Sequence, residues 1–249
     1  MSNLIKPNMQ LGFDVDVALI LARGKARYVN PDRQGDSKQA VSAVRQPTLH
    51  EAKGIFVRAG ARTFVDNSSF PPEIAKQYMT IARCGRVFRL AHHAYDAFIR
   101  VREDAYVLAP VLVDRVLVNG GVAVPSCSAW GGFNDKLAVI DGAFGFSFFE
   151  IQLRAMLNAT LLKTNSSVRI RNPETLLLAS MTAAGRPVLQ QPRDSIAVIT
   201  SQISSSGTTC FRPTITTLGS FAPDGEHSCL PHTGYHELLQ WMVSGERVC

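Results

Sequence analysis

Apolar runs alternate with amphipathic segments through the first hundred residues, and this alternation limits the possible folds more than any other feature. Strands are expected at 16–22, 62–66 and 96–104, and helices at 48–60 and 68–93, so the two kinds of element alternate. Continuous apolar runs are typical of strands in a parallel sheet that is covered on both faces. The sequence therefore predicts an α/β fold with a mainly parallel central sheet.

The second half of the chain continues this pattern and then loses it. Further elements are expected at 122–125, 137–140, 146–161, 172–184 and 188–199. Asn172 is a suitable N-cap for the helix that follows it, and Gly185 is a suitable stop. Residues 1–13 look like a leader, residues 14–199 form one domain, and residues 200–249 are expected to be an extended or partly ordered tail, because they are rich in Ser and Thr and have no periodicity.

Composition narrows the class of protein. The 249 residues carry a net charge of +6, which favours anionic partners through long-range attraction. Lys and Arg are spread along the chain rather than gathered in blocks, so no nucleic-acid partner is expected. Five cysteines without a CxxC pair indicate a reducing, cytoplasmic location. No run of about 18 apolar residues is present, so no membrane span is expected.

Polar side chains alternate with apolar ones in the segment 96–104. Arg100, Arg102 and Asp104 share one face of the predicted strand, while Ile99 and Val101 point to a core. Guanidinium groups bind phosphate oxygens, and a carboxylate is a ligand for Mg²⁺. A solvated strand face with an Arg–Asp ion pair is the alternative interpretation.

A basic turn follows the first predicted strand. It contains Arg23, Gly24, Lys25 and Arg27. Open α/β sheets bind ligands at the carboxyl ends of their strands, where this turn is expected to lie. A plain basic turn after a core strand explains the same residues equally well. The chain has neither a GxGxxG nor a Walker pattern, so a standard dinucleotide site or P-loop is not supported.

A glycine-rich segment precedes the predicted strand 137–140. Gly131 and Gly132 allow close approach of the backbone, and Asn134 and Asp135 add short polar side chains. The neighbouring aromatic residues suit sugar binding, whereas a glycine-rich turn is the simpler alternative. Glu174, near the start of the helix 172–184, either pairs with the helix dipole or projects into a site.

Four segments together resemble a family of small GT-A-type glycosyltransferases found in large algal viruses, bacteria and algae. They are YDAFIRVRED, VAVPS, GGFNDKLAVID and NPETLL, and VALILARGKAR is similar to the family's first strand and basic turn. The resemblance covers roughly residues 15–190. It implies a GT-A-like, nucleotide-sugar-binding α/β/α sandwich that transfers a sugar from a nucleotide-sugar donor to a hydroxyl of a glycan or glycoprotein acceptor.

The resemblance also implies roles for individual residues. Contacts to the donor would come from Arg23, Gly24, Lys25, Arg27, Asp66, Arg100, Arg102, Gly132 and Asn134. Asp104 would hold a divalent metal, Mn²⁺ or Mg²⁺. The chain lacks a literal DXD at this point, and Arg100 and Arg102 could take over part of the cation's role. Asp135 or Glu174 would be the general base that an inverting transferase requires.

Two other functions explain the same residues. A basic module could bind a nucleic-acid backbone through the arginine face, and its affinity would fall steeply with salt. A catalytically inactive protein of the same fold would bind a nucleotide sugar without turning it over.

Overall fold

We describe the fold from a computed structural model of the chain. The residues that it describes are 2–13, 15, 17–19, 27–29, 51, 72–90, 95–102, 105–117, 119–126, 129, 131–157, 172–192, 195–203 and 209–212. The predicted strand 62–66 lies outside this part of the chain, as does the predicted helix 48–60 apart from Glu51.

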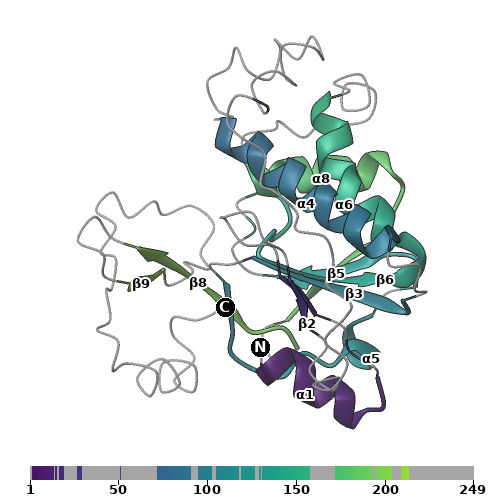
Figure 1. The fold of residues 1–249 in the computed structure, drawn as a ribbon. Coiled ribbons are helices and arrows are strands. Elements are labelled where there is room, and N and C mark those ends of the chain that lie inside the picture. The colour runs from purple at the N-terminus through teal and green to yellow at the C-terminus, as the bar shows by residue number, and fades with distance from the viewer. Residues whose placement is uncertain are drawn as a thin grey trace.

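A four-stranded sheet forms the middle layer of the molecule (Figure 1). Its strands, in spatial order, are β3 (Ala97–Val101), β6 (Leu137–Asp141), β5 (Val122–Pro125) and β7 (Val188–Gln191). One face is covered by the helices α4 (Pro72–Leu90), α6 (Gly142–Leu157) and α8 (Pro173–Ala183). On the other side lie α1 (Ser2–Gln10) and α5 (Val113–Val116). An α/β architecture with helices on both sides of a sheet is therefore confirmed.

The direction of the strands differs from the prediction. β6 is antiparallel to both of its neighbours, and only β5 and β7 are parallel. The expected mainly parallel sheet is therefore wrong, and the sheet is mixed. No described helix lies between β5 and β6 in the chain, and a parallel pairing needs a long crossover connection, usually helical. An apolar run indicates that a strand is buried on both faces, but it does not indicate whether the strand is parallel or antiparallel to its neighbours.

The central strand β6 contributes side chains to two cores. Ala138 and Ile140 pack in the core beneath α4, α6 and α8. Leu137 and Val139 belong to a second core, to which α1 and α5 contribute. Because alternate side chains of a strand point to opposite faces, burial on both faces explains why LAVI is a continuous apolar run.

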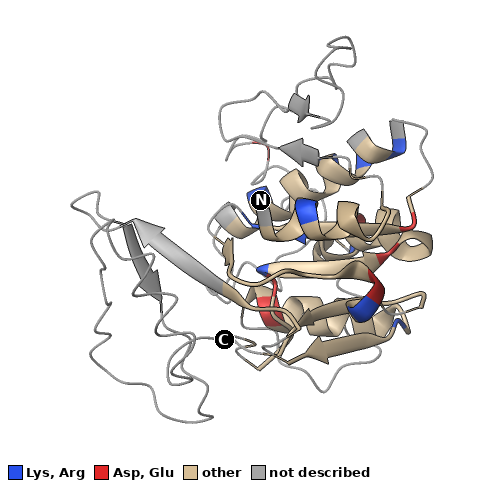
Figure 2. Ribbon diagram, turned by 90° about the horizontal axis from the view of Figure 1, so that it is seen from below, with Lys and Arg blue, Asp and Glu red and all other residues tan. Residues whose placement is uncertain are grey.

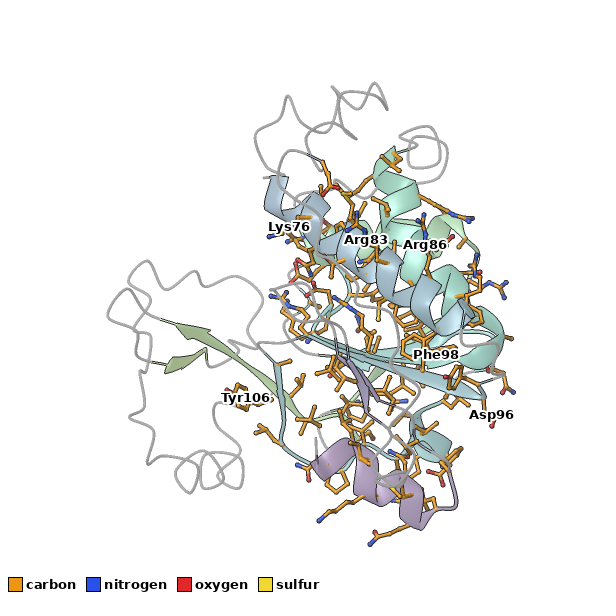
Figure 3. The ribbon with its side chains drawn as sticks, in the orientation of Figure 1. Lys76, Arg83, Arg86, Asp96, Phe98 and Tyr106 are labelled. Atoms are coloured by element: carbon orange, nitrogen blue, oxygen red, sulfur yellow. The ribbon has the colours of Figure 1, made fainter. Side chains whose placement is uncertain are left out.

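The helical layer packs closely where α4 crosses α6. The apolar spacing in 68–93 predicts one buried helical face that includes Tyr78, Ile81 and Gly85, and all three residues are buried. A Cβ atom at Gly85 would lie 2.6 Å from Cβ of Phe149, so glycine allows the two helices to approach. Phe98 of β3 packs beneath these helices (Figure 3), with its ring centroid 5.7 Å from that of Phe149.

The expected leader is part of the folded domain. Residues 2–10 form α1, and Asn8 is buried against the segment that precedes α5. Its side-chain amide donates to the carbonyl of Val111 at 2.7 Å, and its Oδ1 accepts from the backbone N–H of Val113 at 2.9 Å. Local patterns did not reveal these hydrogen bonds, because they join residues about a hundred positions apart in the chain.

Two smaller sheets complete the described structure. β1 (Val17–Leu19) pairs in antiparallel fashion with β2 (Arg27–Val29) and not with the central sheet, contrary to the prediction for 16–22. A three-stranded sheet contains β4 (Ala105–Val107), β8 (Val198–Ile203) and β9 (Thr209–Arg212). The predicted domain boundary between 199 and 200 therefore falls inside β8. Within the described residues, no helix has the length and apolar character needed to cross a membrane.

Candidate functional site

Charged side chains from three parts of the chain meet at one edge of the central sheet. We call them the charged cluster: Arg100, Arg102, Asp135, Lys136 and Glu174. Antiparallel pairing places Val101 of β3 opposite Leu137 of β6, so the end of β3 lies beside the start of β6. The N–H of Arg102 donates to the carbonyl of Lys136 at 2.9 Å and extends this pairing beyond the strands.

Asp135 lies at the centre of the charged cluster, and its side chain is 0% exposed. Lys136 Nζ is 2.7 Å from Oδ1, and Arg102 Nη1 donates to Oδ2 at 3.2 Å. Arg100 Nη1 donates to the backbone carbonyl of Asp135 at 2.5 Å. Burial acts to raise the pKa of Asp135, but the positive charges of Lys136, Arg102 and Arg100 outweigh it and lower the pKa to about 2. Asp135 therefore stays ionised and acts as the counter-ion of three cations.

Glu174 shares Lys136 with Asp135. Lys136 Nζ donates to Oε1 of Glu174, so one ammonium group bridges the two carboxylates. Burial and the negative charge of Asp135 raise the pKa of Glu174, and Lys136 only partly offsets them. The two carboxylates thus differ: Asp135 is held ionised, whereas Glu174 has a greater tendency to hold a proton.

The first turn of α8 positions Glu174. Asn172 is the N-cap, as predicted, and its Oδ1 accepts from the N–H of Thr175 at 2.8 Å. Pro173 occupies the first helical position, where its missing N–H costs nothing. Gly185 follows the helix with φ of 61°, which confirms the predicted stop.

Two residues of the glycine-rich segment make contacts within the protein. Gly132 approaches the backbone of Glu174 so closely that a Cβ atom would lie 2.1 Å from its carbonyl carbon. The next residue, Phe133, donates its N–H to that carbonyl at 3.1 Å. Asn134 is buried, and its Oδ1 accepts from the N–H of Lys136 at 2.7 Å. The close backbone approach expected at Gly132 is therefore made to α8. The contacts of Gly132 and Asn134 with a sugar donor stay predictions.

Helix α4 adds two residues that sequence reasoning did not assign to a site. Gln77 Nε2 donates to Oδ2 of Asp135 at 3.4 Å, and the Tyr78 hydroxyl lies 3.5 Å from the carbonyl oxygen of Pro173. Tyr78 was predicted as a core residue, and it is one. Its hydroxyl is the feature of the sequence that could have indicated a role near the site, because a buried tyrosine usually brings its hydroxyl to a hydrogen-bond partner.

Several predicted site residues are not brought into the charged cluster by the described structure. Arg23, Gly24, Lys25, Asp66 and Asp104 lie outside the described residues, and of Arg27 only the backbone is described, in β2. Within the described residues, no three His, Cys, Asp or Glu side chains gather to hold a metal ion. The metal-binding role of Asp104 stays a prediction.

The charged cluster has the chemistry of an anion site next to a proton acceptor. It contains three cations and two carboxylates, so its net charge is positive when all five groups are ionised. Of the side chains that form ion pairs in the charged cluster, that of Arg102 is the most exposed, at 25% against 11% for Lys136. Among the residues that the structure describes, Lys and Arg are spread over several elements (Figure 2).

Comparison with known proteins adds no relative. The chain matches no protein-family model, no curated protein and no solved structure.

Proposed function

We propose that the chain is a nucleotide-sugar-dependent glycosyltransferase that transfers a sugar to a hydroxyl of a glycan or glycoprotein. One observation carries the proposal: three of the segments that carry the resemblance meet in the charged cluster. YDAFIRVRED contributes Arg100 and Arg102, GGFNDKLAVID contributes Asp135 and Lys136, and NPETLL contributes Glu174. The pairing of β3 with β6 and the backbone contact of Phe133 with Glu174 bring these three segments to one place.

In this proposal the cations of the charged cluster bind the negatively charged diphosphate of the donor. Transfer of a sugar leaves a nucleoside diphosphate, and positive groups that are already in place stabilise the charge that develops on it. Arg102 is the side chain that the diphosphate would reach first, because it is more exposed than Lys136 or Asp135. Asp135 keeps the cations together when no ligand is present.

Glu174 is the better candidate for the general base. A base must be basic enough to accept the proton of the acceptor hydroxyl and must reach that hydroxyl. Asp135 has a lowered pKa and a fully buried side chain, whereas the pKa of Glu174 is raised and its side chain is 7% exposed. We therefore assign proton transfer to Glu174 and the positioning of cations to Asp135.

A screen of nucleotide sugars tests the function. Binding is measured by thermal shift with and without Mn²⁺, since a ligand of the folded state raises its melting temperature. Hydrolysis and transfer are then followed for each ligand found. Glu174→Gln should lower kcat by at least about a hundredfold and leave donor affinity within about threefold. Glu150→Gln, on the outer side of α6 and paired with Arg154, is the matched control and should keep wild-type turnover.

Other outcomes separate the alternative functions. Binding of a nucleotide sugar without any turnover identifies an inactive protein of the same fold. Binding of single-stranded or duplex oligonucleotides that weakens steeply with salt, without nucleotide-sugar binding, identifies a nucleic-acid module and overturns the proposal. If Glu174→Gln keeps its turnover while Asp135→Asn loses it per folded molecule, the two carboxylates have exchanged roles.

A further inference from the structure

Tyr78 reaches the charged cluster from the helical layer. Its ring is packed in the core beneath α4, and the residue is 1% exposed. The hydroxyl lies 3.5 Å from the carbonyl oxygen of Pro173, the residue immediately before Glu174. This contact joins α4 to the first turn of α8, where the position of Glu174 is set.

The neighbouring residue of α4 reaches the other carboxylate. Gln77 Nε2 donates to Oδ2 of Asp135 at 3.4 Å. Consecutive residues of a helix point about 100° apart, so one turn of α4 contacts both Asp135 and the start of α8. Thr80, on the next turn, instead donates to the carbonyl of Lys76 at 2.8 Å, a bond within α4.

We propose that Tyr78 is a positioning residue, whose hydroxyl holds the first turn of α8 so that Glu174 stays in contact with Lys136. The proposal rests on the proposed function for its catalytic consequence. It assigns to α4 a part in the site that no motif of the sequence indicated. The hydroxyl acts on Glu174 through the backbone of Pro173 and does not touch a substrate.

The surroundings of Glu174 determine what loss of this contact would do. Tyr78 faces it from α4, Arg100 and Arg102 lie at the end of β3, and Asp135 and Lys136 precede β6. Of the two groups from the β6 side, Lys136 favours the ionised form of Glu174 and Asp135 opposes it. If the first turn of α8 shifts away from Lys136, the favourable charge is lost, and the pKa of Glu174 rises further.

The variant Tyr78→Phe removes the hydroxyl and keeps the ring in the core, so the protein is expected to fold. Its kcat should fall about tenfold at neutral pH, with KM for the donor within about twofold, because donor binding depends on the cations. The acid limb of its kcat–pH profile should move to higher pH by about half a unit or more. Thr80→Val, which removes a hydroxyl from the same helix away from the cluster, should change neither quantity.

A second measurement does not depend on activity. In protein labelled with ¹³C at the Glu carboxyl carbons, the Glu174 signal is identified by its loss in Glu174→Gln. Its titration midpoint should be higher in Tyr78→Phe than in wild type and unchanged in Thr80→Val. If Tyr78→Phe lowers only the melting temperature, with the same midpoint and acid limb as wild type, Tyr78 is a core residue and the inference is wrong. If wild type turns over no nucleotide sugar, the proposed function fails, while the titration still decides the role of Tyr78.

Discussion

Gly132 and Glu174 are in direct backbone contact, although 42 positions separate them in the numbering of the chain. A Cβ atom at Gly132 would lie 2.1 Å from both the carbonyl carbon and the carbonyl oxygen of Glu174. The contact joins the segment that carries Asp135 and Lys136 to the helix that carries Glu174. The distance between the backbones of Gly132 and Glu174 therefore affects whether Lys136 can bridge the two carboxylates.

Gly132→Ala should separate α8 from this segment. Backbone atoms cannot move aside as a side-chain end can, so the added methyl group should lower the free energy of unfolding by about 1–3 kcal/mol. Turnover should fall further than stability alone explains, because Glu174 moves. Urea unfolding and kcat report the two effects. Gly131→Ala is the control: its φ is 82° and its nearest neighbour is 3.9 Å away, so it pays only a conformational cost of about 1–2 kcal/mol. Equal turnover in the two variants would contradict the argument.

The stability of the protein should fall in acid partly through Asp135. Its pKa lies near 2 in the folded protein, below its ordinary value of 3.8, so folding favours the ionised form. This contribution is present above pH 3.8 and is lost as the pH falls towards 2. The difference in unfolding free energy between wild type and Asp135→Asn should shrink by about 2 kcal/mol from pH 6 to pH 2.5. Urea titrations across this range measure it. A difference that does not change with pH would show that Asp135 is not held by the cations.

Replacement of Arg102 should weaken binding of the leaving nucleotide. Arg102→Met keeps most of the side-chain volume and removes the charge that is most exposed to a ligand. The affinity for the nucleoside diphosphate of the donor should fall by about tenfold or more, as expected for loss of a charge-assisted contact. Calorimetry gives the value directly. Arg154→Met removes an exposed guanidinium that pairs with Glu150 on α6, and it should leave the affinity unchanged. Wild-type affinity in Arg102→Met would remove Arg102 from the site.

Loss of the helix cap should affect Glu174 as well as stability. Asn172→Ala removes the acceptor of the Thr175 N–H and should lower the free energy of unfolding by about 1 kcal/mol. Because the cap sets the first turn of α8, kcat should fall as well. Ser180→Ala, which removes a hydroxyl bonded to the Leu176 carbonyl later in α8, should leave kcat unchanged. Thermal or urea unfolding and turnover assays check both expectations, and a variant with lower stability but full turnover would limit Asn172 to a structural role.

Local patterns predicted local structure well. Helix α4 was expected from the spacing of its apolar residues and α8 from its cap and stop, and both lie where these features placed them. The burial of β6 followed from its unbroken apolar run. The predicted faces of residues 99–102 agree with the structure: Arg100 and Arg102 both reach Asp135, one at its backbone carbonyl and one at its carboxylate, while Ile99 and Val101 pack against a core.

Tertiary structure alone decided how these elements combine. Strand direction depends on the connections and on pairing between distant strands, so the apolar run of β6 could not reveal that both of its neighbours are antiparallel to it. The surroundings of a group determine its charge: the cations around Asp135 outweigh its burial and lower its pKa. Tyr78 lies beside the charged cluster because its hydroxyl reaches the carbonyl of Pro173 at the start of α8. The sequence by itself determined the elements with a strong local pattern, such as α4, α8 and β6, because periodicity and caps are local. The position of each charged group depends instead on contacts between residues far apart in the chain.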